Sequence, residues 1–385
     1  MCKVYILKII FTMKIAYLSI DDPKDYISWS GLKLNIYKTL KNLGHEIKIV
    51  GPFKDKKRLP FIAKRELLKL FNYKYDSERK FFLSKIYAKK INTFIFNNKI
   101  DLIFTSDSYL ISHLKTNIPI ILWLDVTYKT YFNHYFNNNK LHNKSFKEAN
   151  DLEKLALHKA KKIILTSKWS KDETVKNYNI NPKKVEIIPF GSNLKKNKVI
   201  KRINKKDNLD LVSIGVDWER KGMDKTIKIT EYLNKQGLNT RLNIIGSSHN
   251  KKKFPKYINQ VGFLDKNKKK EHSKIIKILS NADFHILMTK KEACGVVFAE
   301  ANSCGIYNIT NDVGGVRGMI KNNINGKLFK LNDSESKIAK YIIKIFKDKK
   351  KLFELKKKSF KYYKQQLNWK ANSSKLQIIL LKAKN

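Results

Sequence analysis

The feature that most constrains this chain is a repeated alternation of short apolar runs with longer amphipathic stretches. In the first half, we predict strands at residues 13–20, 46–50, 101–105, 118–124, 162–166 and 185–189. In the second half, the apolar runs lie at residues 209–215, 241–246, 258–263, 283–288 and 306–310. Because these runs are continuous rather than alternating, they are typical of strands that are covered on both faces of a parallel sheet.

Between the strands we predict helices at residues 31–43, 146–161, 170–178, 225–235, 269–279 and 296–303, and two more from residues 334 and 352. A charged stretch with few apolar residues, LKKNKVIKRINKKDN, follows Asn193 and predicts a linker. The 385 residues exceed what one hydrophobic core usually serves, and an apolar fraction of 42% excludes a disordered chain. We therefore expect an α/β fold with two doubly wound, Rossmann-like domains at residues 1–195 and 209–365, joined by a basic linker at 196–208.

The charge of the chain bears on its partners. It has 81 Lys and Arg against 33 Asp and Glu, a formal net charge of +48, yet only seven of the cations are Arg. Proteins that read nucleic-acid bases rely on Arg, so the composition argues against a dedicated nucleic-acid function and predicts attraction to anionic surfaces such as a membrane leaflet. In residues 54–90, cations are interleaved with aromatic residues. This pattern is compatible with three interpretations: binding to an anionic bilayer, ordinary helices that pack on the first sheet, or binding of single-stranded nucleic acid.

The three cysteines, Cys2, Cys294 and Cys304, are odd in number and form no C-x-x-C pair. A disulfide framework and a thiolate zinc site are therefore not expected, and a reducing cytosol fits best. No apolar run approaches the ~18 residues of a membrane-spanning helix. The first residues, MCKVYILKIIFT, resemble a secretion signal only superficially, since no small-residue cleavage site follows and Met13 can serve as the start.

The segment KEACGVVFAEANSCG, at residues 291–305, follows a predicted strand and opens a helix near Val296. Glu292 then lies in the turn at the carboxyl end of that strand, where open α/β sheets bind ligands. Gly295 permits a close backbone approach, and the amides at the helix N-terminus attract an anion. Glu300 lies further along the same helix. A ligand that contains a sugar, a diphosphate and a ribose would bind to all of these groups. Glycoside hydrolysis by the two carboxylates is the competing chemistry.

The segment IGVDWERKGMDK ends the first predicted strand of the second half and begins a helix. Lys221 and Gly222 lie at that helix N-terminus, so an ammonium group and free amides converge on one point. Lys is a compact phosphate ligand, and this position favours a phosphate contact over a solvated surface Lys.

In these segments the chain resembles the retaining glycosyltransferases of the GT-B fold, family four, the glycogen-synthase-like enzymes. KEACGVVFAEANSCG matches the family's E-x7-E signature through Glu292 and Glu300, and GVDWERKG matches the phosphate-lysine block through Lys221. IYNITNDVGGVRGMIKNNINGKLF matches the downstream block, and LTSKWSKDETVKNYNINPKKVEIIPFGSN matches the block that closes the first domain. The match covers residues 146–329 well and the first 145 residues in pattern only.

The resemblance implies roles for particular residues. Glu292 would contact hydroxyls of the donor sugar and Glu300 those of the ribose. Lys221 and the amides of Gly295, Val296 and Val297 would stabilise the departing diphosphate. Asp125, at the end of the strand 118–124, either faces the donor sugar or caps the next turn. Further nucleotide contacts are assigned to Arg220 and Gly246.

Two positions depart from the family pattern, and both lie near the predicted donor site. Val216 stands where the family usually has an Arg five residues before the phosphate lysine, and Arg220 is the substitute that we expect. Gly318 stands where a Glu commonly follows the double glycine, so no donor contact is assigned there.

The resemblance implies a GT-B glycosyltransferase with two Rossmann-like domains facing a central cleft, in which residues 1–195 form the acceptor domain and residues 209–365 the nucleotide-sugar domain. A C-terminal helix, residues 366–385, is expected to return to the first domain. The enzyme would be a retaining, metal-independent hexosyltransferase without a cofactor, moving sugar from a nucleotide-sugar donor to a glycan or lipid-linked acceptor. We expect a cytoplasmic place, peripheral at the inner membrane face, in surface polysaccharide or lipopolysaccharide assembly. The alternatives are a non-catalytic basic protein that binds nucleic acid or anionic membrane, and a GT-B sugar-nucleotide epimerase or phosphorylase.

Overall fold

The computed structural model describes residues 12–26, 28–53, 56–136, 141–194, 207–249 and 253–384. They form two compact units, each with its own parallel sheet. The first unit groups the described residues up to Thr166 with Ser170–Ile188 and with those from Ser373 onward. The second unit groups Ser167–Trp169 with Pro189–Asn372. Most of the predicted linker at 196–208, and the first eleven residues, lie outside the described part of the chain.

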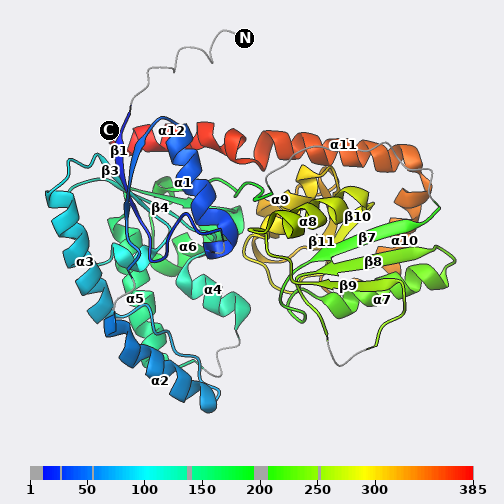
Figure 1. The fold of residues 1–385 in the computed structure, drawn as a ribbon, viewed down its shortest axis with the longest axis horizontal. Coiled ribbons are helices and arrows are strands. Elements are labelled where there is room, and N and C mark those ends of the chain that lie inside the picture. Colours follow the sequence, from blue (N-terminus) through cyan, green and yellow to red (C-terminus); the bar gives the residue numbers. More distant parts are fainter. Residues whose placement is uncertain are drawn as a thin grey trace, which may run out of the picture. The chain divides into compact units, whose positions relative to one another are not determined.

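The first unit is built on a six-stranded parallel sheet in the order β2-β1-β3-β4-β5-β6 (Figure 1). Its strands are β1 Lys14–Leu18, β2 Glu46–Val50, β3 Leu102–Thr105, β4 Ile120–Trp123, β5 Lys162–Leu165 and β6 Val185–Ile187. Strands β3 and β4 are buried along their whole length, as continuous apolar runs predict. The order reverses between β1 and β3, which makes their carboxyl ends a topological switch point.

The helices of the first unit are α1 Leu32–Asn42, α2 Leu59–Leu70, α3 Phe81–Phe96, α4 Tyr128–Tyr135, α5 Asn143–Lys159 and α6 Lys168–Tyr178. Helices α3 and α5 pack apolar side chains on the sheet core, among them Leu83, Ile91 and Leu152. Helix α2 differs, because none of its twelve residues, all of them described, is buried. It lies away from the sheet of this unit (Figure 1).

The second unit has a six-stranded parallel sheet in the order β12-β11-β10-β7-β8-β9. Its strands are β7 Leu209–Ile214, β8 Thr240–Ile245, β9 Ile258–Gly262, β10 Phe284–Leu287, β11 Tyr307–Asn311 and β12 Gly326–Phe329. Its helices are α7 Met223–Lys235, α8 Lys269–Asn281, α9 Val296–Ser303, α10 Glu335–Lys347 and α11 Lys349–Gln366. The order reverses between β7 and β10, so a second switch point lies at their carboxyl ends.

The last helix, α12 Trp369–Lys384, begins in the second unit, and its residues from Ser373 onward belong to the first. In the first unit its Gln377 Oε1 lies 3.0 Å from His45 Nε2, and Lys384 Nζ binds Asp101 at 3.0 Å. Among the described helices, none has both the length and the apolar character that a membrane crossing requires.

The predicted fold class, two doubly wound α/β units, is confirmed. All eleven predicted strands are present within a few residues of their expected bounds. Strand β12 and helix α4 were not predicted, because GKLF is too short and mixed for a strand pattern and YKTYFNHY contains few strong helix formers. Helices α2 and α3 correspond to only one of the three interpretations of residues 54–90.

Candidate functional site

The candidate site lies in the second unit at the switch point between β7 and β10, where the turns after these two neighbouring strands meet. Lys221 follows β7 and Glu292 follows β10. The ammonium of Lys221 hydrogen-bonds Glu292 Oε2 in an ion pair. Lys221 is 7% exposed and Glu292 6% exposed. The two groups that the sequence predicted to act on one ligand are thus brought into direct contact.

Two glycines shape the turn that carries Lys221. Gly222 adopts a φ of 66°, and a Cβ there would lie 1.9 Å from the carbonyl oxygen of Met288, at the end of β10. A Cβ at Gly215 would lie 2.7 Å from Cγ of Lys221. Only residues without side chains let the Lys221 stem cross Gly215 and let this turn approach the neighbouring strand so closely.

The turn that carries Glu292 ends in the N-terminus of α9. Gly295 has a φ of 80° and is the residue that precedes the helix. A Cβ at Gly295 would lie 2.5 Å from the ring of Phe298 and 3.2 Å from Cγ of Glu292. The left-handed backbone at Gly295 therefore starts α9 directly beside Glu292. The first amides of this helix have no partner within the helix by its geometry, which makes its N-terminus a site for an anion.

Arg220 also lies at this turn. Its Nη1 is 3.7 Å from Glu292 Oε2 and donates to the carbonyl of Lys291 at 3.2 Å, while its Nε donates to Asp217 at 3.1 Å. Because α7 begins only at Met223, Arg220 and Lys221 both lie in the preceding turn, and both reach Glu292.

Glu300 is buried inside α9, at 1% exposure. One carboxylate oxygen accepts a hydrogen bond from Lys266 Nζ, in the segment after β9. The other oxygen, Oε2, has no hydrogen-bond partner among the residues that the structure describes. A buried carboxylate oxygen without a partner is costly, so this position is suited to the hydroxyl groups of a ligand.

The segment that matches the family's downstream block packs against the same turn. The Gly315 amide donates to the Glu292 carbonyl at 2.9 Å, and a Cβ at Gly315 would lie 1.8 Å from the Ala293 carbonyl. Asp312 binds Arg317 bidentately, with Nε to Oδ1 at 2.8 Å and Nη2 to Oδ2 at 2.5 Å. The double glycine thus supports the backbone on which Glu292 stands.

Comparison with known proteins agrees with the fold. The family model described as glycosyl transferases group 1 matches residues 194–364, and the model described as glycosyltransferase family 4 matches residues 34–196. The sucrose-phosphate synthase of Thermosynechococcus elongatus is 17% identical and superimposes with a TM-score of 0.69 over 96% of this chain and 98% of its own. Anabaena HepE in complex with UDP is 13% identical, with a TM-score of 0.66 over 96% of this chain and 100% of its own.

The chain belongs to the glycosyltransferases of the GT-B fold.

A curated relative, the phosphatidylinositol N-acetylglucosaminyltransferase gpi3 subunit of Schizosaccharomyces pombe, is 26% identical over 177 residues. That match covers 44% of this chain and 38% of the relative, so the chain matches well under half the length of that relative. The two family models together extend the likeness to residues 34–364, and so into the first 145 residues, where the sequence matched the GT-B family in pattern only.

Gly246, another residue assigned to the nucleotide, ends β8 beside the Lys221 turn. It has a φ of 103°, its amide donates to Gly262 at 2.8 Å, and a Cβ would lie 2.7 Å from the carbonyl oxygen of Gly215. Gly246 therefore stands next to Gly215 at the carboxyl ends of the two strands. The structure gives it a role in close backbone packing of this GT-B unit.

Asp125 belongs to the first unit and is described there alone. It follows β4; its Oδ1 accepts from the Val126 amide at 2.8 Å, and its carbonyl accepts from the hydroxyls of Thr166 and Ser170. Its side chain lines a pocket of that unit. These contacts fix Asp125 in the turn and are compatible with both of its predicted roles.

His285, on β10, is a residue near the site that sequence reasoning missed. It is fully buried, and its Nδ1 lies 2.7 Å from Oδ1 of Asn308. Burial lowers the pKa of His285 to about 4, since the Asn308 hydrogen bond, which raises it, does not compensate, and nearby Lys221 lowers it further. A single His within an apolar strand does not indicate, from the sequence alone, that its side chain will lie near the site. Among the described residues, no group of three or more His, Cys, Asp and Glu is placed to hold a metal ion.

Proposed function

We propose that this chain transfers a sugar from a nucleotide-sugar donor to a hydroxyl group of an acceptor, and that the second unit holds the donor. The observation that carries the proposal is the contact of Lys221 with Glu292 at the N-terminus of α9, at the β7/β10 switch point. An ammonium group, unpaired helix amides and a carboxylate at one point match a diphosphate joined to a sugar.

Lys221 and the amides of Gly295, Val296 and Val297 would receive the diphosphate. When the bond between sugar and diphosphate breaks, negative charge develops on the leaving oxygen, and donors already in position stabilise it without reorganisation. Arg220, whose guanidinium is held by Asp217 at 3.1 Å, adds a second cation at the same turn. These groups would supply the positive charge of a metal-independent reaction.

Glu292 and Glu300 would bind the hydroxyl groups at either side of the diphosphate. Glu292 stands in the turn before α9 and would accept from hydroxyls of the donor sugar. Glu300 is about one turn into the helix, and its buried Oε2 would accept from the ribose. Carboxylates only accept hydrogen bonds when ionised, so they suit paired hydroxyl groups. That HepE was solved with UDP, and with UDP-glucose, supports this choice of donor class.

The proposal includes contact with an anionic membrane through α2. Leu59, Ala63, Leu67 and Leu70 are all exposed and are spaced so that they form one stripe along the helix. Leu67 is 57% and Leu70 78% exposed, and residues 56–70 contain six Lys and Arg against one Glu. An apolar stripe flanked by cations is the composition that binds in the plane of an anionic bilayer. A peripheral place at the inner membrane face, and acceptors of surface-glycan assembly, agree with this surface.

The test is an activity screen of the full chain with UDP-, GDP- and ADP-sugars, following release of the nucleoside diphosphate and the fate of the sugar. Transfer to an added glycan or lipid-linked acceptor, with the anomeric configuration retained in the product, is the expected result. Formation of a new sugar nucleotide without acceptor would indicate an epimerase, and sugar 1-phosphate formed with inorganic phosphate would indicate a phosphorylase. Absence of any turnover together with strong, salt-dependent binding of RNA would contradict the proposal.

A further inference from the structure

The first unit contains a pocket of about 440 Å³ at the carboxyl ends of its central strands. Asp21 lies after β1, Asp107 after β3 and Asp125 after β4, and all three line the pocket. The order of the sheet reverses between β1 and β3, so this is the switch point of the first unit. Open α/β sheets bind ligands in the crevice at such a point.

The charge of this pocket is opposite to that of the chain. Its lining has two cations, Lys33 and Arg79, and six carboxylates: Asp21, Asp76, Glu78, Asp107, Asp125 and Glu153. The formal excess is four negative charges, or three when Glu153 is left out because burial raises the pKa of that carboxyl. The whole chain has a net charge of +48. The lining therefore repels anions, although the chain as a whole attracts them.

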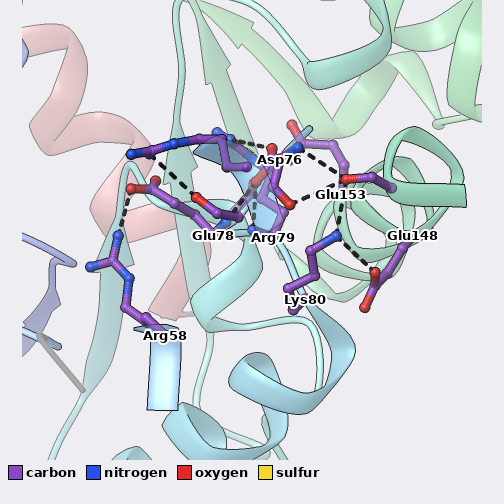
Figure 2. A network of polar contacts seen from close by, with 11 residues as sticks. Arg58, Asp76, Glu78, Arg79, Lys80, Glu148 and Glu153 are labelled. Carbon is purple, nitrogen blue, oxygen red and sulfur yellow. Dashed lines mark hydrogen bonds and ion pairs between the residues drawn. The ribbon is translucent and has the colours of Figure 1, made fainter. Parts of the chain in front are cut away.

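Both lining cations are already bound to lining carboxylates. Lys33 Nζ lies 2.8 Å from Asp107 Oδ2 and 3.5 Å from Asp21, and Arg79 Nη1 lies 3.2 Å from Asp76 Oδ2. Figure 2 shows Arg79 held against Asp76, whose other oxygen accepts from the amides of Glu78 and Arg79 at 2.8 Å. Glu78 in turn binds Arg58 at 2.6 Å. Because Lys33 and Arg79 are each paired within the lining, the remaining lining carboxylates leave an excess of negative charge there.

Tyr109 supplies an independent sign of a ligand. It lines the pocket at 2% exposure, and its hydroxyl has no hydrogen-bond partner among the described residues. Burial raises the pKa of Tyr109, and the carboxylate of Asp107 raises it further, so the hydroxyl keeps its proton. A buried donor without a partner is costly, and a ligand oxygen would satisfy it.

Aromatic rings complete the lining. Trp29, Tyr128, Tyr131 and Phe132 line the pocket, and the Arg79 guanidinium lies 5.4 Å from the ring of Tyr109 and 5.0 Å from that of Tyr128. Aromatic walls with a few fixed polar groups are typical of small-molecule sites, and the C–H faces of a sugar ring pack on such rings. Carboxylates accept from the hydroxyl groups at the rim of the sugar.

We propose that this pocket binds a hydroxyl-rich sugar of the acceptor that is uncharged or bears an amine, and that it excludes sugars bearing a phosphate or carboxylate. The assignment to an acceptor rests on the proposed glycosyl transfer, whereas the binding preference does not. Tyr109 is a ligand-binding residue through its hydroxyl.

Binding is tested on the full chain without donor, by ligand-observed NMR titration in about 150 mM salt, where surface lysines are largely screened. The probes are methyl α-D-glucopyranoside, its 2-amino-2-deoxy analogue and methyl α-D-glucuronide, which share one ring and differ in charge. We expect the neutral and amino glycosides to bind at least about tenfold more tightly than the glucuronide. A glucuronide that binds as tightly as the neutral glycoside, or binding of none of the three, would overturn the inference.

Two Tyr variants separate ligand binding from folding. Tyr109→Phe removes a hydroxyl without a partner, so it should leave the melting temperature unchanged. It should weaken binding of the neutral glycoside about threefold to tenfold. Tyr178→Phe is the matched control in the same unit, because its hydroxyl donates to Asn150 at 2.8 Å and accepts from the Lys129 amide at 2.9 Å, and Tyr178 does not line the pocket. It should lower the melting temperature and leave glycoside binding unchanged. Equal glycoside binding by wild type and Tyr109→Phe would refute the role of Tyr109.

A charge variant tests the exclusion of anions. Glu78→Gln should strengthen glucuronide binding relative to the neutral glycoside, whereas Glu186→Gln should not. Glu186 is a suitable control because it is also half-exposed, pairs with Lys162 at 3.4 Å and does not line the pocket. An unchanged preference in Glu78→Gln would contradict the electrostatic argument.

UDP, GDP and ADP are titrated in parallel, so that the two proposals fail separately. Binding of a nucleoside diphosphate without any glycoside binding would overturn this inference and leave the proposed function standing. Glycoside binding with no nucleoside diphosphate binding would support the pocket as a sugar site and count against the proposed function.

Discussion

At the scale of single residues, the ion pair between Lys221 and Glu292 affects how variants of the site should be interpreted. Both groups are buried and paired, so removing one leaves the other as a buried charge. Arg220, at 3.7 Å from Glu292, compensates the carboxylate in part when Lys221 is removed, but it cannot compensate the ammonium when Glu292 is removed. Breaking such a pair typically costs about 3 kcal/mol of stability. Loss of activity in a single variant can therefore reflect unfolding as well as lost chemistry.

We predict that Lys221→Met and Glu292→Gln each lower the melting temperature, whereas the double variant recovers most of the loss because neither charge remains. Sugar transfer should fall by about a hundredfold or more in all three, since Lys221 stabilises the leaving diphosphate. Melting curves and turnover with the best donor check both parts. A double variant with wild-type turnover would remove Lys221 and Glu292 from the mechanism.

Glu300 provides a prediction on binding rather than chemistry. Glu300→Gln should weaken binding of the nucleoside diphosphate about tenfold, because Oε2 is lost as an ionised acceptor for the ribose. Glu271→Gln is the matched control, since Glu271 also pairs with a Lys of the same unit, Lys268 at 3.2 Å. Calorimetric titration with UDP, GDP and ADP measures the difference. Similar losses in both variants would point to a general charge effect.

His285 gives the second unit a dependence on pH. Its pKa in the folded protein is about 4 against 6.5 for an exposed His, so between these values the unfolded chain binds a proton that the folded chain does not. Stability should therefore fall as the pH decreases from 6.5 towards 4, by at most about 3 kcal/mol from this group. His285→Leu should flatten the pH profile of unfolding in urea over that window. Parallel profiles for wild type and variant would disprove the effect.

At the scale of elements, helix α2 allows membrane contact to be tested without changing the stability of the fold. Because α2, described in full, has no buried residue, Leu67→Ser with Leu70→Ser should leave the melting temperature unchanged. The same pair should weaken binding to vesicles rich in phosphatidylglycerol about tenfold, since two exposed Leu side chains no longer enter the bilayer.

Co-sedimentation with phosphatidylglycerol vesicles, and with phosphatidylcholine vesicles for comparison, measures this difference. Leu155→Ser is the control, because Leu155 is an exposed Leu on α5, outside the stripe. Unchanged sedimentation of the double variant would contradict membrane contact through α2.

The elements were predictable where apolar runs were continuous, and less so elsewhere. Strands β3, β4 and β10 are buried throughout and were found close to their true bounds. For the segment 54–90 three interpretations stayed open: an anionic bilayer, ordinary helix packing and single-stranded nucleic acid. The structure places helices α2 and α3 there, and α3 packs on the sheet core. Arg79 of this segment lies over the rings of Tyr109 and Tyr128, which are distant in sequence, so no local pattern could have predicted that contact.

At the scale of the whole molecule, two parallel sheets each reverse strand order once, and each reversal carries a distinct set of polar groups. Lys221 and Glu292 are 71 residues apart and meet because β7 and β10 are neighbours. Hydrophobic periodicity predicts strands but not their order, so the resemblance to a family was needed to bring these residues together. The direct pairing of their side chains could not be predicted, since spacing alone gives no side-chain direction.

The central claim is that the second unit grips a nucleoside diphosphate through Lys221, Glu292 and Glu300. Calorimetric titration of the full chain and of the Lys221→Met/Glu292→Gln double variant with UDP, GDP and ADP tests it most directly. We predict that at least one nucleotide binds the wild type and binds the variant at least about tenfold more weakly. Equal affinity in both proteins, or no binding of any of the three by the wild type, would contradict the account.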